Sequence, residues 1–124
     1  MMQSRLDRGT RGQRGRCERI NERVPLDMPV QYQHNGRIHA GIGADISSGG
    51  LKMRAKQMRV RCGEKIKLFF PLRRSTGTRS QLCMATGIVV WRDGSSVGIR
   101  FHDPAESVQL LINEYVNRHT KVWI

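Results

Sequence analysis

The sequence predicts a small antiparallel β-barrel that is closed by a single C-terminal helix. Three observations support this fold class. Apolar residues alternate with polar residues over several short segments from Met28 onward. Asn35-Gly36 and Asp93-Gly94 are two-residue turn signals between such segments, because both positions accept a positive φ. Apolar residues recur at helical spacing only near the C-terminus.

Residues 1–23 are expected to form a mobile arm that precedes a folded domain spanning residues 24–124. The arm contains seven of the 17 arginines of the chain and almost no apolar residues. Such a segment cannot bury enough apolar surface to fold alone. The composition changes at Val24-Pro25, where the folded domain is expected to begin. A chain of 124 residues is long enough for one domain with one modest core.

Six strands are expected within the folded domain. Four of them pair as two hairpins, with turns at Asn35-Gly36 and Asp93-Gly94. A sharp turn at Ser47–Gly50 leads into the third strand, and residues 73–79 are expected to form a polar loop. The expected strands, in chain order, are Met28–His34, Arg37–Ile46, Leu51–Ala55, Glu64–Leu72, Leu82–Arg92 and Val97–His102.

A helix is expected over about residues 104–118. Asp103 is the expected N-cap, Pro104 suits the first helical position, and Glu106 completes a cap-like pattern. One apolar stripe at helical spacing should pack on an open end or flank of the sheet. Its residues are Val108, Leu111, Ile112, Tyr115 and Val116.

The charge of the chain predicts an anionic partner. The net charge is +12, and 17 of the 22 basic residues are arginine. Such an excess indicates a nucleotide, a nucleic acid, an acidic protein or an acidic lipid, and arginine favours bidentate contacts to phosphate and guanine. No apolar run approaches the roughly 18 residues of a membrane-spanning helix. No apolar stretch follows the charged N-terminus either, so we expect a cytoplasmic protein.

Catalytic and metal-binding patterns do not stand out in this sequence. The three cysteines and four histidines show no spacing typical of a metal site or a disulfide framework. We find no Ser/His/Asp or Cys/His arrangement, no paired carboxylates and no phosphate-cradling glycine loop. We therefore expect no metal, no cofactor and no enzymatic activity.

Two short motifs carry the candidate binding chemistry. Arg19 and Arg23 form an Arg-x-x-x-Arg pair, which is expected roughly twice by chance at this arginine content. Residues 45–50, DISSGG, contain Asp-x-Ser-x-x-Gly, which is expected only roughly 0.03 times by chance, although such residues also build ordinary tight turns. Because a hairpin at Asn35-Gly36 returns the chain to its starting end, the two motifs should be neighbours in space.

Together the two motifs resemble those of the PilZ family, the bacterial receptors of cyclic di-GMP. The resemblance covers about residues 19–118 and implies a six-stranded antiparallel barrel with a C-terminal helix. It also implies a non-catalytic receptor that controls motility, biofilm or exopolysaccharide production through an unidentified partner protein. The matching positions are Arg19 and Arg23 of the first motif, Asp45, Ser47 and Gly50 of the second, then Leu51, Trp91, Gly98-Ile99-Arg100-Phe101 and the helix.

Each motif residue offers a contact to cyclic di-GMP. Arg19 and Arg23 can donate to the Hoogsteen edge of guanine or to phosphates, and one good guanine pair is worth about 1–3 kcal/mol of discrimination. Asp45 can accept from the ring N–H and the amine of guanine, and Ser47 can donate to a phosphate. Gly50 would let the ligand approach the backbone closely. The second-tier candidates are Gly49 for close approach, Trp91 for stacking and Arg16.

The residue before Arg19 bears on how many ligands bind. Several members of the family carry another arginine at that position, which holds an intercalated ligand dimer, whereas this chain has Glu18. Arg14 and Arg16 are the candidates to substitute for it. We expect one ligand per protomer, and a monomer or weak homodimer.

Two alternative functions stay open. The first is a nucleic-acid-binding small β-barrel that uses the basic arm. The net charge favours it, but aromatic residues are only 6% of the chain and are not interleaved with basic residues on one strand face. The second is a PilZ-like module that acts through protein contacts and binds no ligand.

Overall fold

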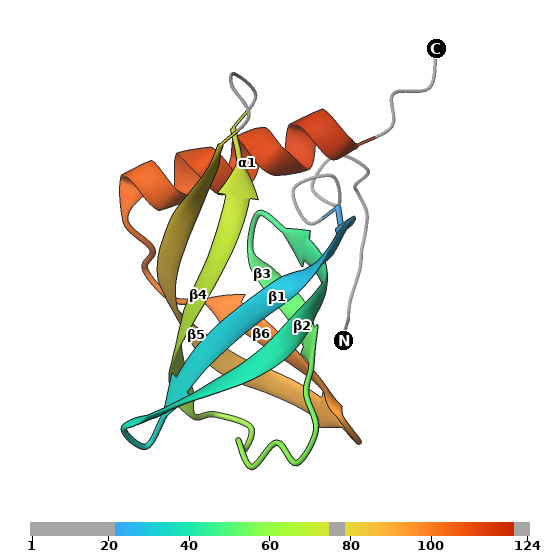
Figure 1. Ribbon diagram of the computed structural model, residues 1–124, viewed down its shortest axis with the longest axis vertical. Coiled ribbons are helices and arrows are strands. Elements are labelled where there is room, and N and C mark those ends of the chain that lie inside the picture. Colours follow the sequence, from blue (N-terminus) through green and yellow to red (C-terminus); the bar gives the residue numbers. More distant parts are fainter. Residues whose placement is uncertain (1–21, 75–78, 121–124) are drawn as a thin grey trace, which may run out of the picture.

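The structure, a computed structural model, describes residues 22–74 and 79–120. In order, the elements are β1 (Val24–His34), β2 (Arg37–Ser47), β3 (Gly50–Arg54), β4 (Lys65–Arg73), β5 (Ser80–Asp93), β6 (Ser96–Phe101) and α1 (Glu106–His119). The strands form a closed antiparallel barrel in the order β1-β2-β3-β6-β5-β4, with α1 across one end (Figure 1). The predicted fold class, a six-stranded antiparallel β-barrel with one C-terminal helix, is confirmed.

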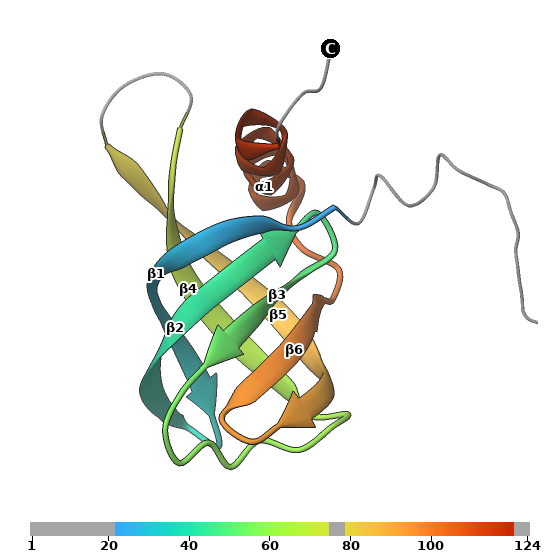
Figure 2. The ribbon, with the colours of Figure 1, turned by 90° about the vertical axis from the view of Figure 1, so that its right-hand side faces the viewer.

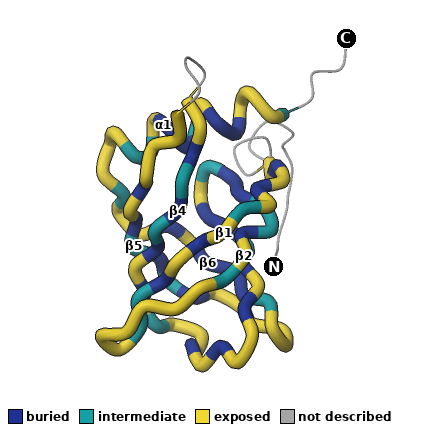
Figure 3. The backbone as a smooth tube through the Cα atoms, in the orientation of Figure 1, coloured by how far each residue is buried: buried dark blue, intermediate teal, exposed yellow. Residues whose placement is uncertain are grey.

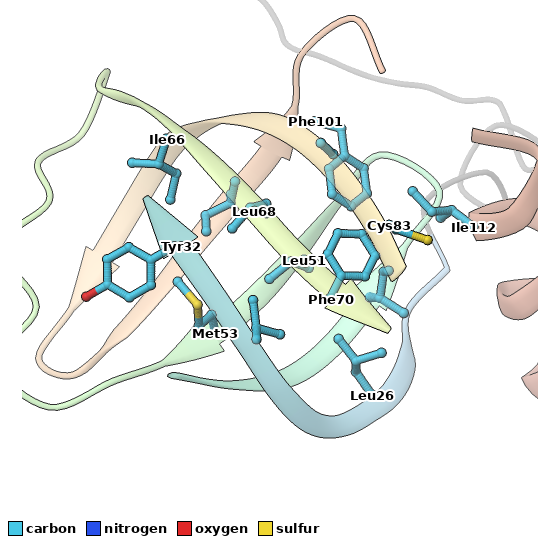
Figure 4. Close-up of a cluster of buried hydrophobic side chains, with 14 of the residues drawn as sticks. Leu26, Tyr32, Leu51, Met53, Ile66, Leu68, Phe70, Cys83, Phe101 and Ile112 are labelled. Atoms are coloured by element: carbon cyan, nitrogen blue, oxygen red, sulfur yellow. The ribbon is translucent and has the colours of Figure 1, made fainter. Parts of the chain in front are cut away.

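Buried and exposed residues alternate along the strands (Figure 3). The buried side chains fill the inside of the barrel. In β4, Leu68 and Phe70 are fully buried, whereas Lys65 and Lys67 are exposed. The ring of Phe70 stacks on that of Phe101 with centroids 6.1 Å apart, near the middle of the cluster in Figure 4. Each fully buried Leu or Phe stabilises the fold by about 1.5–3 kcal/mol relative to an exposed one, so the interior holds the barrel together.

The two ends of the barrel are closed by different segments. At one end α1 buries Leu111 and Ile112 against the strands, and Figure 2 shows the helix above the barrel. At the other end the loop between β3 and β4 inserts Met58 and Val60, which are 3% and 0% exposed. The guanidinium of Arg92 donates to the carbonyl oxygens of both loop residues. This arginine therefore fastens the loop to the end of β5.

β1 begins at Val24, earlier than the predicted Met28. Pro25 and Asp27 are unfavourable in a strand interior, so the sequence pattern pointed away from a strand here. The pairing of Pro25 with Asp45 on β2 overrides that preference, and a bulge follows at Asp27, whose φ is 47°. Because β1 pairs with β4 over only three residue pairs, its first half has an unpaired edge that tolerates proline.

The predicted helix is present and starts two residues later than about 104, but its predicted N-terminal cap is wrong. α1 begins at Glu106 and ends at His119, one residue beyond the prediction. Asp103 does not cap it, because its φ of 49° lies in the left-handed region and a capping residue needs an extended backbone. Ala105 occupies the cap position without a side-chain hydrogen bond. The chain thus turns at Asp103 as it leaves β6, and the other strand bounds differ from prediction by one or two residues.

The remaining sequence predictions concern the N-terminal arm, the cysteines, metal binding and membrane-spanning helices. Residues 1–21 lie outside the described residues, so the division between arm and domain stays a prediction. In the described part of the chain, Cys62 and Cys83 are free thiols, and burial raises the pKa of Cys83 to about 11. Over the same residues, no cluster of possible metal ligands occurs and no helix is long and apolar enough to span a membrane.

The alternation of buried and exposed residues in β4 provides a test of which side chains form the core. Replacing Phe70 with Ala should lower the free energy of unfolding by about 3–5 kcal/mol, because a cavity is left in the closed barrel. The neighbouring Phe69→Ala, on the outer face, is the matched control and should cost about 1 kcal/mol or less. Chemical denaturation measures both, and equal losses would contradict the assignment of inner and outer faces.

Candidate ligand-binding site

The two sequence motifs meet at the start of β1. Arg23 immediately precedes β1, and Pro25 pairs with Asp45 on β2. Nη1 of Arg23 donates to Oδ1 of Asp45 over 2.6 Å, with the two side chains 47% and 27% exposed. The end of the arm therefore lies beside the Asp-Ser-Gly turn, as the hairpin argument predicted. An exposed ion pair stabilises a fold by at most about 1 kcal/mol, so it can rearrange around a ligand at small cost.

The two other candidate arginines are not placed. Arg16 and Arg19 lie outside the described residues. Their participation in the site stays a prediction that rests on their spacing from Arg23.

Ser47 is buried and forms part of the turn itself. It is only 4% exposed. Its hydroxyl donates to the carbonyl oxygen of Gly50 over 3.4 Å and accepts from the N–H of Gly49 over 3.3 Å. These bonds satisfy a buried polar group and fix the turn between β2 and β3. Donation from Ser47 to a phosphate stays a prediction, and it requires the hydroxyl to leave its bond to Gly50.

Gly50 is required by the packing of β3 on β6. A Cβ atom at this position would lie 2.1 Å from the carbonyl oxygen of Ile99, which is backbone and cannot move aside cheaply. The neighbouring Gly49 accepts a hydrogen bond from the N–H of Phe101 over 2.8 Å. The two glycines thus join the turn to β6, and their contact with a ligand stays a prediction.

A row of outward-facing residues runs from the ion pair across the barrel wall. Asp45 pairs with Lys52, Lys52 with Gly98, and Gly98 with Trp91, and residues opposite one another share a face. The Trp91 ring lies over Gly98, where a Cβ would meet it at 2.0 Å. Trp91 is 37% exposed, and the Lys52 ammonium lies 5.9 Å from the ring centroid. Trp91 therefore presents a half-exposed aromatic face on the wall that carries Asp45.

α1 is hydrogen-bonded to both sides of the site. Nε2 of Gln109 donates to the carbonyl oxygen of Ser48 in the turn over 2.9 Å. The hydroxyl of Tyr115 donates to the carbonyl oxygen of Pro25, next to the ion pair, over 3.2 Å. Figure 1 shows α1 lying across the end of the barrel where these segments meet. The helix is therefore joined to both the turn and the start of β1.

Lys52 and Gln109 are the residues of the site that sequence reasoning missed. The alternation in β3 places Lys52 on the outer face, but only the register of four strands brings it between Asp45 and Trp91. Gln109 carried no signal, because its partner is a backbone carbonyl distant in sequence.

The arrangement suits one kind of ligand. The guanidinium of Arg23 keeps donors beyond the one that Asp45 uses, since arginine has five N–H groups. The carboxylate of Asp45 keeps acceptor capacity, and Trp91 offers a planar face. A ligand with an anionic group, N–H donors and a flat ring matches this set.

Comparisons with known proteins give a family and a fold. A sequence model of the PilZ domain matches residues 13–118 of this chain. No curated protein matches it.

Three solved structures share the fold. The inhibitor of motility MotI/DgrA of Bacillus subtilis has a TM-score of 0.66 at 18% identity, over 86% of this chain and 51% of that one. The PilZ domain of CeSA from a cellulose-synthesizing bacterium has a TM-score of 0.58 at 12% identity, over 73% and 90%. PlzA of Borreliella burgdorferi, solved in complex with c-di-GMP, has a TM-score of 0.55 at 20% identity, over 78% and 40%. This chain thus spans about half of MotI/DgrA and less of PlzA.

The geometry of the site predicts that substitutions of Gly50 and Asp45 change the free energy of unfolding by different amounts. Gly50→Ala should lower the free energy of unfolding by about 1–3 kcal/mol, because its Cβ forces β3 away from β6. Asp45→Ala removes only the exposed ion pair and should change it by about 1 kcal/mol or less. Urea denaturation of the two variants checks this. A Gly50→Ala variant as stable as the parent would show that the close approach to Ile99 is not needed.

Proposed function

The chain belongs to the PilZ domain family, and we propose that it is a non-catalytic receptor for cyclic di-GMP. The observation that carries the proposal is the 2.6 Å contact between Arg23 and Asp45, which joins the arginine motif to the Asp-Ser-Gly turn. Two motif residues from distant parts of the chain meet at one surface point, where both remain partly exposed. The fold shared with PlzA, which was solved with c-di-GMP, supports the same ligand class.

Binding would use the polar groups in complementary ways. Asp45 accepts from the N–H groups on the Watson–Crick edge of a guanine, which adenine does not offer in that pattern. Arg23 donates to a Hoogsteen edge or a phosphate, as an arginine fork does elsewhere. In this proposal Arg19 joins Arg23 at the ligand, and the arm becomes ordered on binding. Ordering costs about 1–2 kcal/mol per residue, so more than one arginine contact is needed to offset it.

The signal would pass through α1 to a partner protein. The helix holds the turn through Gln109 and the start of β1 through Tyr115. Leu110 on the same helix is 60% exposed, which gives a partner an apolar point of contact. A partner that binds α1 differently in the two states of the arm would read the ligand.

Calorimetric titration with cyclic di-GMP tests the receptor proposal. The parent chain should bind near micromolar, about −8 kcal/mol. Arg19→Ala, Arg23→Ala and Asp45→Ala should each weaken binding by about tenfold or more, since a charge-assisted hydrogen bond contributes about 1.5–3 kcal/mol. Arg79→Ala removes an equal charge from the exposed end of the β4–β5 connection and is the matched control.

The same titration distinguishes the alternatives. Cyclic di-AMP should not bind, because the acceptor pattern of Asp45 selects guanine. The measured stoichiometry tests the expectation of one ligand per protomer. No saturable heat with cyclic di-GMP would leave the motif residues with a structural role only. Oligonucleotide binding with a steep salt dependence would instead favour the nucleic-acid alternative.

Hydrogen exchange tests the route through α1. Cyclic di-GMP should increase protection of backbone amides in α1 of the parent chain, because the ligand fixes the turn that Gln109 holds. Gln109→Ala should bind the ligand but lose most of the added protection in α1. Asn113→Ala, which removes only the second partner of Gln109, is the matched control. Equal protection in the parent and Gln109→Ala would argue against this route.

A further inference from the structure

A pocket lies at the end of the barrel opposite α1. It has a volume of about 560 Å³, within the range of small-molecule sites. Its walls are the β1–β2 hairpin and the loop between β3 and β4, which lie together at the lower end in Figure 1. The lining residues that bear on its chemistry are Tyr32, His34, Arg37, His39, Lys56 and Arg59.

The charged lining of this pocket is entirely cationic. Arg37 comes from the hairpin, and Lys56 and Arg59 come from the facing loop. The nearby carboxylate, Glu64, is already engaged: it accepts from the N–H of Arg61 over 2.7 Å and lies 3.1 Å from Nε2 of His34. Three cations from two segments therefore face one concave volume, which concentrates positive potential there.

A buried hydroxyl without a partner lines the same pocket. Tyr32 is 3% exposed, yet no hydrogen bond joins its hydroxyl to any of the residues described here. Figure 4 shows the hydroxyl pointing away from the labelled core side chains. A tyrosine hydroxyl carries its proton at neutral pH and can donate, and burial raises the pKa of Tyr32 further above its ordinary value. A buried donor normally has an acceptor, and here the pocket is the place from which one can come.

The pocket is held by interactions that do not involve a ligand. The rings of Tyr32 and His39 stack with centroids 5.0 Å apart. Arg92 holds the loop through the carbonyl oxygens of Met58 and Val60. The two walls are thus positioned before any ligand binds.

We propose that this pocket binds a small phosphate-bearing anion, at a site separate from the Arg23–Asp45 surface. A phosphate group supplies acceptor oxygens for the Tyr32 hydroxyl and charge for the cations around it. Arg37 and Arg59 approach the anion from opposite walls. The cations line a concave pocket and not a linear groove, which favours a small anion over a nucleic-acid strand.

A titration followed by backbone amide NMR tests this proposal. The probes are ATP and inorganic pyrophosphate, added to the full chain in about 0.15 M salt, where surface charges are largely screened. Cyclic di-GMP is left out, because it is itself a phosphate-bearing anion that can occupy the pocket, and ATP lacks the guanine that Asp45 would select. We expect saturable shifts at Tyr32, Arg37, Lys56 and Arg59. Tighter binding of ATP would assign a nucleotide, and equal binding would assign the phosphate group alone.

Variants separate the pocket from general charge. Arg37→Gln with Arg59→Gln should weaken probe binding by about tenfold or more, and Tyr32→Phe by about threefold to tenfold. Arg74→Gln with Arg79→Gln removes the same charge at the other end of the barrel and should change it less than twofold. Equal weakening in both double variants would overturn the proposal. So would shifts clustered away from the pocket, or binding of oligonucleotides without saturable shifts by either probe.

Discussion

The register of β2 on β3 determines the geometry of the candidate site. Ile46 and Leu51 are paired and point into the barrel, where both are fully buried. Side chains alternate along a strand, so this packing turns Asp45 and Lys52 outward. A slip of one residue in the register would bury the Asp45 carboxylate and expose two core side chains. Both changes are unfavourable, so the register is strongly specified. The closed barrel then carries the same register through β6 to Trp91.

The turn after β2 connects this register to the rest of the molecule. The carbonyl oxygen of Gly49 bonds to β6, and that of Ser48 bonds to Gln109 on α1. The hydroxyl of Ser47 satisfies the turn from inside. Residues that resemble a ligand-binding motif therefore also perform structural work. In the receptor that we propose, this double role would connect a ligand on the outer wall with the helix at the end of the barrel.

The two ends of the barrel differ in chemistry because different segments close them. α1 covers one end with apolar side chains and makes polar contacts with the turn, with β1 and with β4. The loop between β3 and β4 closes the other end with Met58 and Val60, and its cations face the β1–β2 hairpin. The two anion-binding surfaces that we propose thus lie on separate parts of a fold with one small core, in keeping with a net charge of +12.

The sequence by itself determined the barrel, its strand order along the chain, and the meeting of Arg23 with Asp45. These follow from local alternation and from a two-residue turn at Asn35-Gly36, which are properties of neighbouring residues. The tertiary structure decided what depends on distant partners. β1 extends back to Val24 because β2 pairs with it, and α1 starts late because Asp103 turns the chain. Two features arise only when segments far apart in sequence are packed together. They are the hydrogen bond of Gln109 to the turn and the position of the Tyr32 hydroxyl in the lining of the pocket.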